Sequence, residues 1–172
     1  MKFVQYLLVS ILLLFSLAIQ AQTALKPGDK APDFNGKDQD GQKISLQQYR
    51  GKKVVLYFYP KDDTPGCTAQ ACNLRDHNDT LAKAGYTVLG VSGDDEVSHK
   101  KFREKYSLPF SLVADPDKTI NKKYGVWVEK ERDGKKVWGT ARTTFLIDEK
   151  GVITKVIDKV DTKEHTNQIL QF

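Results

Sequence analysis

The stretch that decides the fold is residues 54–67, VVLYFYPKDDTPGC. Its first six residues are continuously apolar and rich in β-branched and aromatic side chains, which predicts a central strand buried on both faces. Pro60 ends this strand, and a helix is predicted from about Cys67 to Ala84, before Gly85. The loop between them follows the carboxyl end of a central strand, which is where ligand sites of layered α/β sheets lie.

The rest of the chain alternates predicted strands with predicted helices. Short runs rich in β-branched residues predict further strands at residues 87–92, 111–114, 126–131, 137–140, 143–147 and 152–157. Helical spacing and turn signals predict helices at residues 96–106, 118–124 and from a cap at Asp161 to Leu170. Asp133-Gly134 is a favoured pair for a tight hairpin. This order predicts an α/β domain with a central mixed sheet flanked by helices.

The first two dozen residues differ from the rest of the chain. Residues 7–19, LLVSILLLFSLAI, are an almost unbroken apolar run that follows the basic Lys2 and precedes the small residue Ala21. This pattern is typical of a secretory signal peptide, and the run is short for a membrane span, which needs roughly 20 apolar residues. We expect residues 1–21 to be a signal peptide, or an uncleaved anchor, and residues 22–172 to form one domain. The protein is then exported to a periplasmic or other extracytoplasmic location.

The charge pattern argues against nucleic-acid binding. The formal net charge is +5, but Lys and Arg are interleaved with Asp and Glu throughout. Such mixing is typical of a solvated surface, whereas a nucleic-acid site needs basic residues clustered on one face. The two cysteines and the scattered His77, His99 and His165 match no usual zinc ligand set, so we expect no metal and interpret each histidine as a surface or core residue.

The chain has two cysteines, Cys67 and Cys72. Cys67 falls in the first turn of the predicted helix, where unpaired N–H groups and the helix dipole favour an anion and lower a thiol pKa. Asp62 and Asp63 would oppose this unless they point away. Residues five apart on a helix have Cα atoms roughly 8–9 Å apart, and a disulfide needs about 7 Å or less. The two thiols can therefore bond only if the segment is not helical or if the helix opens.

Two interpretations of this pair stay open on spacing alone. In an exported protein, two cysteines commonly form a permanent structural disulfide. So small a loop would stabilise the fold rather little, because the entropic gain shrinks with loop length. The other interpretation is a redox cycle in which a reactive thiolate is oxidised, the turn unwinds and the second thiol reaches it.

The wider sequence resembles the peroxiredoxins. The pattern Pro60-x-x-x-Thr64-x-x-Cys67 matches their Pro-x-x-x-Thr/Ser-x-x-Cys signature, and TPGCTAQACNLRD is similar to the PrxQ group, also called bacterioferritin comigratory proteins. The similarity extends from GDKAPDF at Gly28 to ARTTFLIDEKG at Gly151. This resemblance implies a thioredoxin-like fold and a thiol peroxidase that reduces hydrogen peroxide and organic hydroperoxides. The group is largely cytosolic, so the apolar leader departs from its usual pattern.

The resemblance also implies roles for the two cysteines. Cys67 would attack the terminal peroxide oxygen as a thiolate and become a sulfenic acid, the first step of cysteine oxidation. Cys72 would condense with it to give an intramolecular disulfide. A thioredoxin-like dithiol protein would reduce that disulfide, no cofactor would be needed, and we expect a monomer.

The remaining site residues follow from the same resemblance. Thr64 would place its hydroxyl against the thiolate and the peroxide, and Pro60 would shield the thiolate from water. Arg142, in ARTTF, matches the family arginine and would favour the thiolate and polarise the O–O bond. The N–H groups of Gly66 and Cys67 would hydrogen-bond the oxygen on which charge develops.

Three rival functions share parts of this pattern. An exported thiol–disulfide oxidoreductase usually carries Cys-x-x-Cys, whereas four residues separate the two cysteines here. A copper chaperone of the same fold would need a histidine ligand and typically three intervening residues. The third rival is a non-catalytic domain with a structural disulfide.

Overall fold

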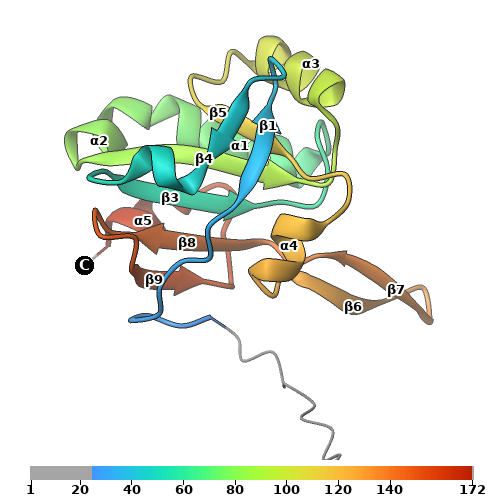
Figure 1. Cartoon of the computed structure of the whole chain (residues 1–172). Coiled ribbons are helices and arrows are strands. Elements are labelled where there is room, and N and C mark those ends of the chain that lie inside the picture. The colour runs from blue at the N-terminus through green and yellow to red at the C-terminus, as the bar shows by residue number, and fades with distance from the viewer. Residues whose placement is uncertain (1–24, 172) are drawn as a thin grey trace, which may run out of the picture.

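The computed structural model describes residues 25–171, which form one layered α/β body (Figure 1). The strands are β1 Asn35–Asp38, β2 Lys43–Ser45, β3 Lys53–Phe58, β4 Tyr86–Ser92, β5 Ser111–Ala114, β6 Trp127–Arg132, β7 Lys135–Thr140, β8 Thr143–Ile147 and β9 Ile153–Ile157. The helices are the 3₁₀ turn η1 Leu46–Tyr49, α1 Pro65–Asp76, α2 Asn78–Lys83, α3 Glu96–Tyr106, α4 Thr119–Lys123 and α5 His165–Leu170. The predicted signal peptide, residues 1–21, lies outside the described residues.

Seven strands form one mixed sheet in the order β2-β1-β5-β4-β3-β8-β9. The central strands β3, β4 and β5 are parallel, and β1 and β8 join them antiparallel on either side. Strands β6 and β7 pair only with each other, as a hairpin that projects from the body (Figure 1). Asp133 and Gly134 form its turn with φ of 53° and 70°, the left-handed conformation that such tight turns need. The predicted mixed sheet is therefore confirmed.

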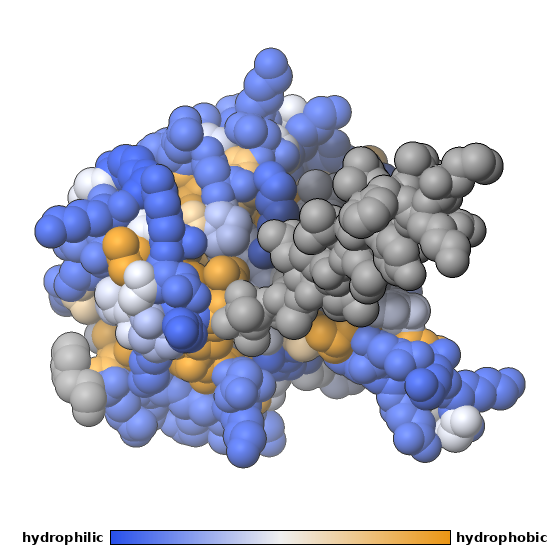
Figure 2. Space-filling view, turned by 60° about the horizontal axis from the view of Figure 1, so that its bottom comes forward, coloured by the Kyte–Doolittle hydropathy of each residue, from blue (hydrophilic) through white to orange (hydrophobic). Residues whose placement is uncertain are grey.

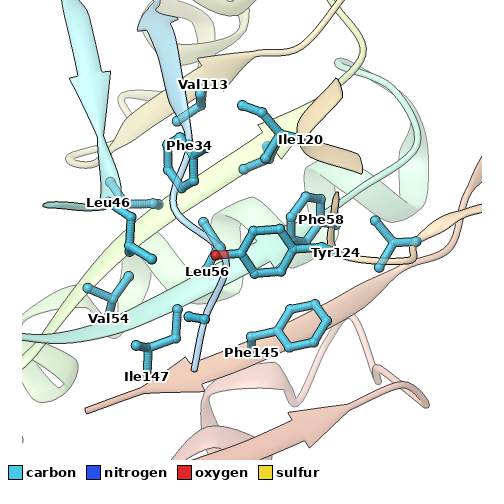
Figure 3. Close-up of a cluster of buried hydrophobic side chains, with 14 of the residues drawn as sticks. Phe34, Leu46, Val54, Leu56, Phe58, Val113, Ile120, Tyr124, Phe145 and Ile147 are labelled. Atoms are coloured by element: carbon cyan, nitrogen blue, oxygen red, sulfur yellow. The ribbon is translucent and has the colours of Figure 1, made fainter. Parts of the chain in front are cut away.

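From Val54 to Phe58, the side chains of β3 are buried on both faces of the sheet, as the continuous apolar run predicts. Val54, Leu56 and Phe58 join the core shown in Figure 3, which is closed by residues 31–34, η1 and α4. The alternate residues Val55 and Tyr57 belong to a second core on the opposite face, against α1, α2, α3 and α5. Two apolar layers thus pack against the two faces of β3 and fix the position of the loop that follows it.

Two predicted helices differ from the observed ones. The helix expected to run to Ala84 is interrupted at His77, whose φ of −113° and ψ of 15° separate α1 from α2. Polar residues around this point are weak helix formers because their side chains compete for backbone hydrogen bonds, and His77 Nδ1 lies 2.9 Å from the Asn73 carbonyl. Asp161 does not cap α5. Its carboxylate accepts from Lys163 N at 2.9 Å in a preceding turn, and α5 begins at His165.

The outer surface carries the mixed charges expected from the sequence. Figure 2 shows a face covered mainly by hydrophilic residues, with smaller hydrophobic areas between them. Within residues 25–171, no helix is long and apolar enough to cross a bilayer. In the same part of the chain, no three His, Cys, Asp or Glu side chains are grouped as a metal site would require.

Candidate active site around Cys67

Cys67 is the third residue of α1 and lies just beyond the carboxyl end of β3. Thr64 is the N-cap in an extended conformation, with φ of −91° and ψ of 150°, and Pro65 occupies the first helical position. Proline suits this position because its missing N–H would have no helical partner there. The Cys67 side chain is only 2% exposed. The Thr-Pro-Gly sequence therefore starts a helix that presents the sulfur in its first turn.

The start of α1 offers hydrogen-bond donors to a negative charge. The first intrahelical bond runs from Thr68 N to Thr64 O at 2.8 Å. The N–H groups of Gly66 and Cys67 precede it, so no helix carbonyl can accept from them. An anion at this position would also gain from the positive end of the helix dipole.

Arg142, in the connection between β7 and β8, brings a positive charge to the sulfur. Its Nη2 lies 3.4 Å from Cys67 Sγ. β8 pairs antiparallel with β3, with Thr143 opposite Phe58, and this register carries Arg142 to the start of α1. Gly66 allows the approach, because a Cβ at that position would lie 3.3 Å from Arg142 Nη2. The structure therefore brings together three residues that the sequence analysis selected, Gly66, Cys67 and Arg142.

The two acidic residues of the loop are engaged away from the sulfur. Asp62 is buried, and its carboxylate accepts from Tyr59 Oη at 2.7 Å and Ser98 Oγ at 2.8 Å. His99 Nδ1 lies 2.8 Å from the same carboxylate. Asp63 accepts from Lys105 Nζ at 2.6 Å. These partners come from Tyr59, directly after β3, and from α3, so they hold the loop and occupy both carboxylates.

Thr64 and Pro60 lie in the same loop but do not make the contacts predicted for them. The Thr64 hydroxyl donates to the Lys61 carbonyl at 3.0 Å, and within residues 25–171 it makes no hydrogen bond to Cys67. Pro60 is exposed and lines a cavity of about 480 Å³ beside the β6–β7 hairpin, together with Trp127 and Trp138. Their roles at the sulfur stay predictions.

Cys72 lies on the same helix, and both thiols are free. Because α1 runs unbroken from Pro65 to Asp76, ideal helix geometry separates the two Cα atoms by roughly 8–9 Å, which exceeds the reach of a disulfide. The side chain of Cys72 is half-buried. The structure is thus that of the reduced pair with its helix intact.

Two further residues belong to the site and were not selected from the sequence. Gln70 Oε1 accepts from Arg142 Nη1, and Gln70 Nε2 lies 3.0 Å from His165 Nδ1. Gln70 stands three residues after Cys67 and so shares its helix face, a signal that could have identified it. His165 contacts a residue 95 positions away, and no local pattern marks it.

Comparison with known proteins identifies the family. The AhpC/TSA family matches residues 27–156. A putative peroxiredoxin bcp of Coxiella burnetii is 50% identical over 147 residues, which cover 86% of this chain and 97% of that protein. Peroxiredoxin Bcp of Escherichia coli is 46% identical, covering 86% of this chain and 95% of that protein. Each of these relatives therefore aligns over nearly its whole length.

Solved structures agree with the sequence relatives. A PrxQ variant from Xylella fastidiosa superposes with a TM-score of 0.80 at 31% identity, covering 85% of this chain and 93% of that chain. The bacterioferritin comigratory protein of Xanthomonas campestris superposes with a TM-score of 0.77 at 32% identity, covering 86% and 94%. These comparisons confirm the predicted thioredoxin-like peroxiredoxin fold.

The same relatives correct the predicted location. The Bcp proteins are a cytoplasmic group of bacterial peroxiredoxins, so the prediction of an exported, periplasmic or extracytoplasmic protein is contradicted. The apolar run after a basic residue was weaker evidence for location than the sequence similarity of the rest of the chain to the Bcp proteins. Residues 27–156 match the family, and the chain belongs to the AhpC/TSA family as a thiol peroxidase of its Bcp/PrxQ group.

Proposed function

We propose that Cys67 is the nucleophile that reduces hydrogen peroxide and organic hydroperoxides. Its thiolate attacks the terminal oxygen of the peroxide, the O–O bond breaks, and the sulfur becomes a sulfenic acid. The leaving oxygen takes a proton and departs as water or an alcohol. The observation that carries this proposal is the guanidinium of Arg142, 3.4 Å from the Cys67 sulfur at the start of α1.

Charge stabilisation explains why this sulfur reacts. Arg142 favours the thiolate before attack and stabilises the negative charge that moves onto the leaving oxygen. The N–H groups of Gly66 and Cys67 point from the same helix end and supply preorganised donors for that charge. The Thr64 hydroxyl would exchange its bond to the Lys61 carbonyl for one to the bound peroxide. Pro60 would exclude water from the edge of the site.

Cys72 completes the cycle as the resolving cysteine. Its thiol condenses with the Cys67 sulfenic acid, forms the S–S bond and releases one water. Because the intact helix holds the two residues too far apart, residues 67–72 must unwind for the bond to form. A thioredoxin-like dithiol protein then reduces the disulfide, and the protein works as a monomer without a cofactor.

Two variants test this assignment with purified, reduced protein and hydrogen peroxide. Cys67→Ser is expected to abolish peroxide consumption. Cys72→Ser is expected to consume about one peroxide per protein and then stop, because the first step needs only the Cys67 thiol. Catalytic turnover in Cys67→Ser would refute the nucleophile, and continued turnover of Cys72→Ser with a thioredoxin donor would refute the resolving role.

A further inference from the structure

A row of buried polar side chains continues behind Arg142. Gln70 bridges Arg142 and His165, and His165 Nε2 lies 3.0 Å from Thr144 Oγ1 on β8. Gln70, Thr144 and His165 are each 0% exposed. Buried polar groups need complete hydrogen bonding to avoid a large desolvation cost. These side chains must therefore form their hydrogen bonds with one another, and this requirement fixes which atoms carry the protons.

The guanidinium of Arg142 determines which atoms of Gln70 and His165 donate and which accept hydrogen bonds. A guanidinium only donates hydrogen bonds, so the group of Gln70 that faces it must be the acceptor Oε1. The other end of the amide, Nε2, then donates to His165 Nδ1, which must carry no proton. The remaining nitrogen, Nε2, keeps its hydrogen and donates it to Thr144. His165 is thus neutral and held as a single tautomer.

The environment of His165 favours that neutral form. Burial, and next the positive charge of Arg142, lower its pKa from 6.5 to about 4. A proton on Nδ1 would place an N–H group against the donating amide of Gln70. Relief would require the amide to turn over, and its NH₂ group would then face the guanidinium, donor against donor. The position of Arg142 is therefore coupled to the state of His165.

We propose that Gln70 and His165 form a positioning dyad that holds Arg142 against the sulfur of Cys67. This inference rests on the proposed function, since it assigns the orientation of Arg142 that the proposed peroxide reaction uses. Among residues 25–171, neither residue hydrogen-bonds to the Cys67 sulfur, whereas Arg142 bonds to both Gln70 and that sulfur. Both residues of the dyad therefore act through Arg142. Gln70 contributes the bridge, and His165 fixes which end of the Gln70 amide faces the arginine.

The dyad is also tied to the redox state of the cysteines. Gln70 lies between Cys67 and Cys72 in α1. Any unwinding that brings the two sulfurs together carries Gln70 with it and separates it from both Arg142 and His165. The arginine is then held in place only while the pair is reduced, which is the state that reacts with peroxide.

The test compares His165→Phe with His165→Asn, both in the Cys72→Ser background so that only the first oxidation is measured. Phenylalanine fills the volume but offers no acceptor, whereas the amide oxygen of an introduced asparagine can accept from Gln70 near the position of Nδ1. We measure the rate of Cys67 oxidation by hydrogen peroxide in stopped flow, and the pH profile of thiolate absorbance. His77→Asn, at an exposed histidine, is the matched control.

His165→Phe is expected to slow oxidation about 10- to 100-fold, as small misplacements of a catalytic group do, and to move the thiolate profile to higher pH. His165→Asn is expected to restore much of both, and the control to match the parent. A purely structural role would lower thermal stability but leave rate and profile unchanged, and that result would overturn the dyad. If the parent itself fails to react with peroxide, the proposed function falls, whereas the shift of the thiolate profile still decides the dyad.

Discussion

Acidification should lower the free energy of unfolding of this protein through protonation of His165 in the unfolded state. The folded protein holds His165 neutral, and its pKa falls from 6.5 to about 4, mainly through burial and secondly through Arg142. Unfolding releases the imidazole to water, where it takes up a proton below about pH 6.5. The unfolded state therefore binds more protons than the native state between these two values, and stability falls as the pH falls.

The size of the effect follows from the two pKa values. The gap between 6.5 and about 4, at about 1.4 kcal/mol per pH unit, makes a full contribution of about 3 kcal/mol. The loss begins as the pH drops through 6.5 and levels off only below about pH 4. Between pH 7 and pH 5, a range in which most domains stay folded, the loss in the free energy of unfolding amounts to about 2 kcal/mol. Arg142 is the charged group that faces His165, while α1 and β8 present the neutral Gln70 and Thr144.

Urea unfolding of reduced protein at a series of pH values measures this contribution. Other groups also titrate, so the informative quantity is the difference in slope between the parent and His165→Phe, which lacks the titrating group. The parent should lose about 2 kcal/mol more than this variant between pH 7 and pH 5, and His77→Asn should follow the parent. Equal slopes in the parent and His165→Phe would show that His165 is not held neutral, and the proton assignment of the row would fail.

Two other substitutions test the site and the core. Arg142→Ala should slow oxidation of Cys67 by peroxide about 100- to 1,000-fold, the usual loss on removing one preorganised donor. Arg142→Lys should recover only part of the rate, because a single ammonium cannot contact the sulfur and also bridge to Gln70. An unchanged stopped-flow rate in Arg142→Ala would show that Arg142 does not act at the site. Gly90→Ala should destabilise the fold by about 1–3 kcal/mol in urea unfolding, since its Cβ would lie 2.7 Å from the Tyr57 ring. A loss as small as that of the control Gly139→Ala, whose Cβ would meet its nearest neighbour at 3.8 Å, would contradict the packing.

Much of the fold was predictable because its signals are local. The continuous apolar run of β3, the alternation of strands and helices, and the Asp133-Gly134 turn each depend on neighbouring residues. Residues 96–106 and 111–114 were predicted with their observed bounds. The break at His77 and the displaced cap at Asp161 were not predicted, because several polar residues compete there and small differences in hydrogen bonding decide between them.

The predicted location failed for a different reason. An apolar run of this length and a small following residue are compatible with export, but they describe composition rather than function. The relatives, matched over almost their full length, overturned it. Local composition of one short segment was a poor guide to location, whereas these relatives align over 86% of this chain.

The amino-acid pattern alone predicted Cys67 at a helix start after a central strand. It also predicted that Cys72 can bond to it only if the segment is not helical or the helix opens, because both predictions depend on residues within one short segment. Only the tertiary structure decided which distant groups meet there. Arg142 reaches the sulfur from 75 residues away through the pairing of β8 with β3. His165 meets Gln70 across 95 residues because α5 packs on α1. Burial, which no local pattern reveals, then favours the neutral form of that histidine, so that Nδ1 accepts from Gln70 and Nε2 donates to Thr144.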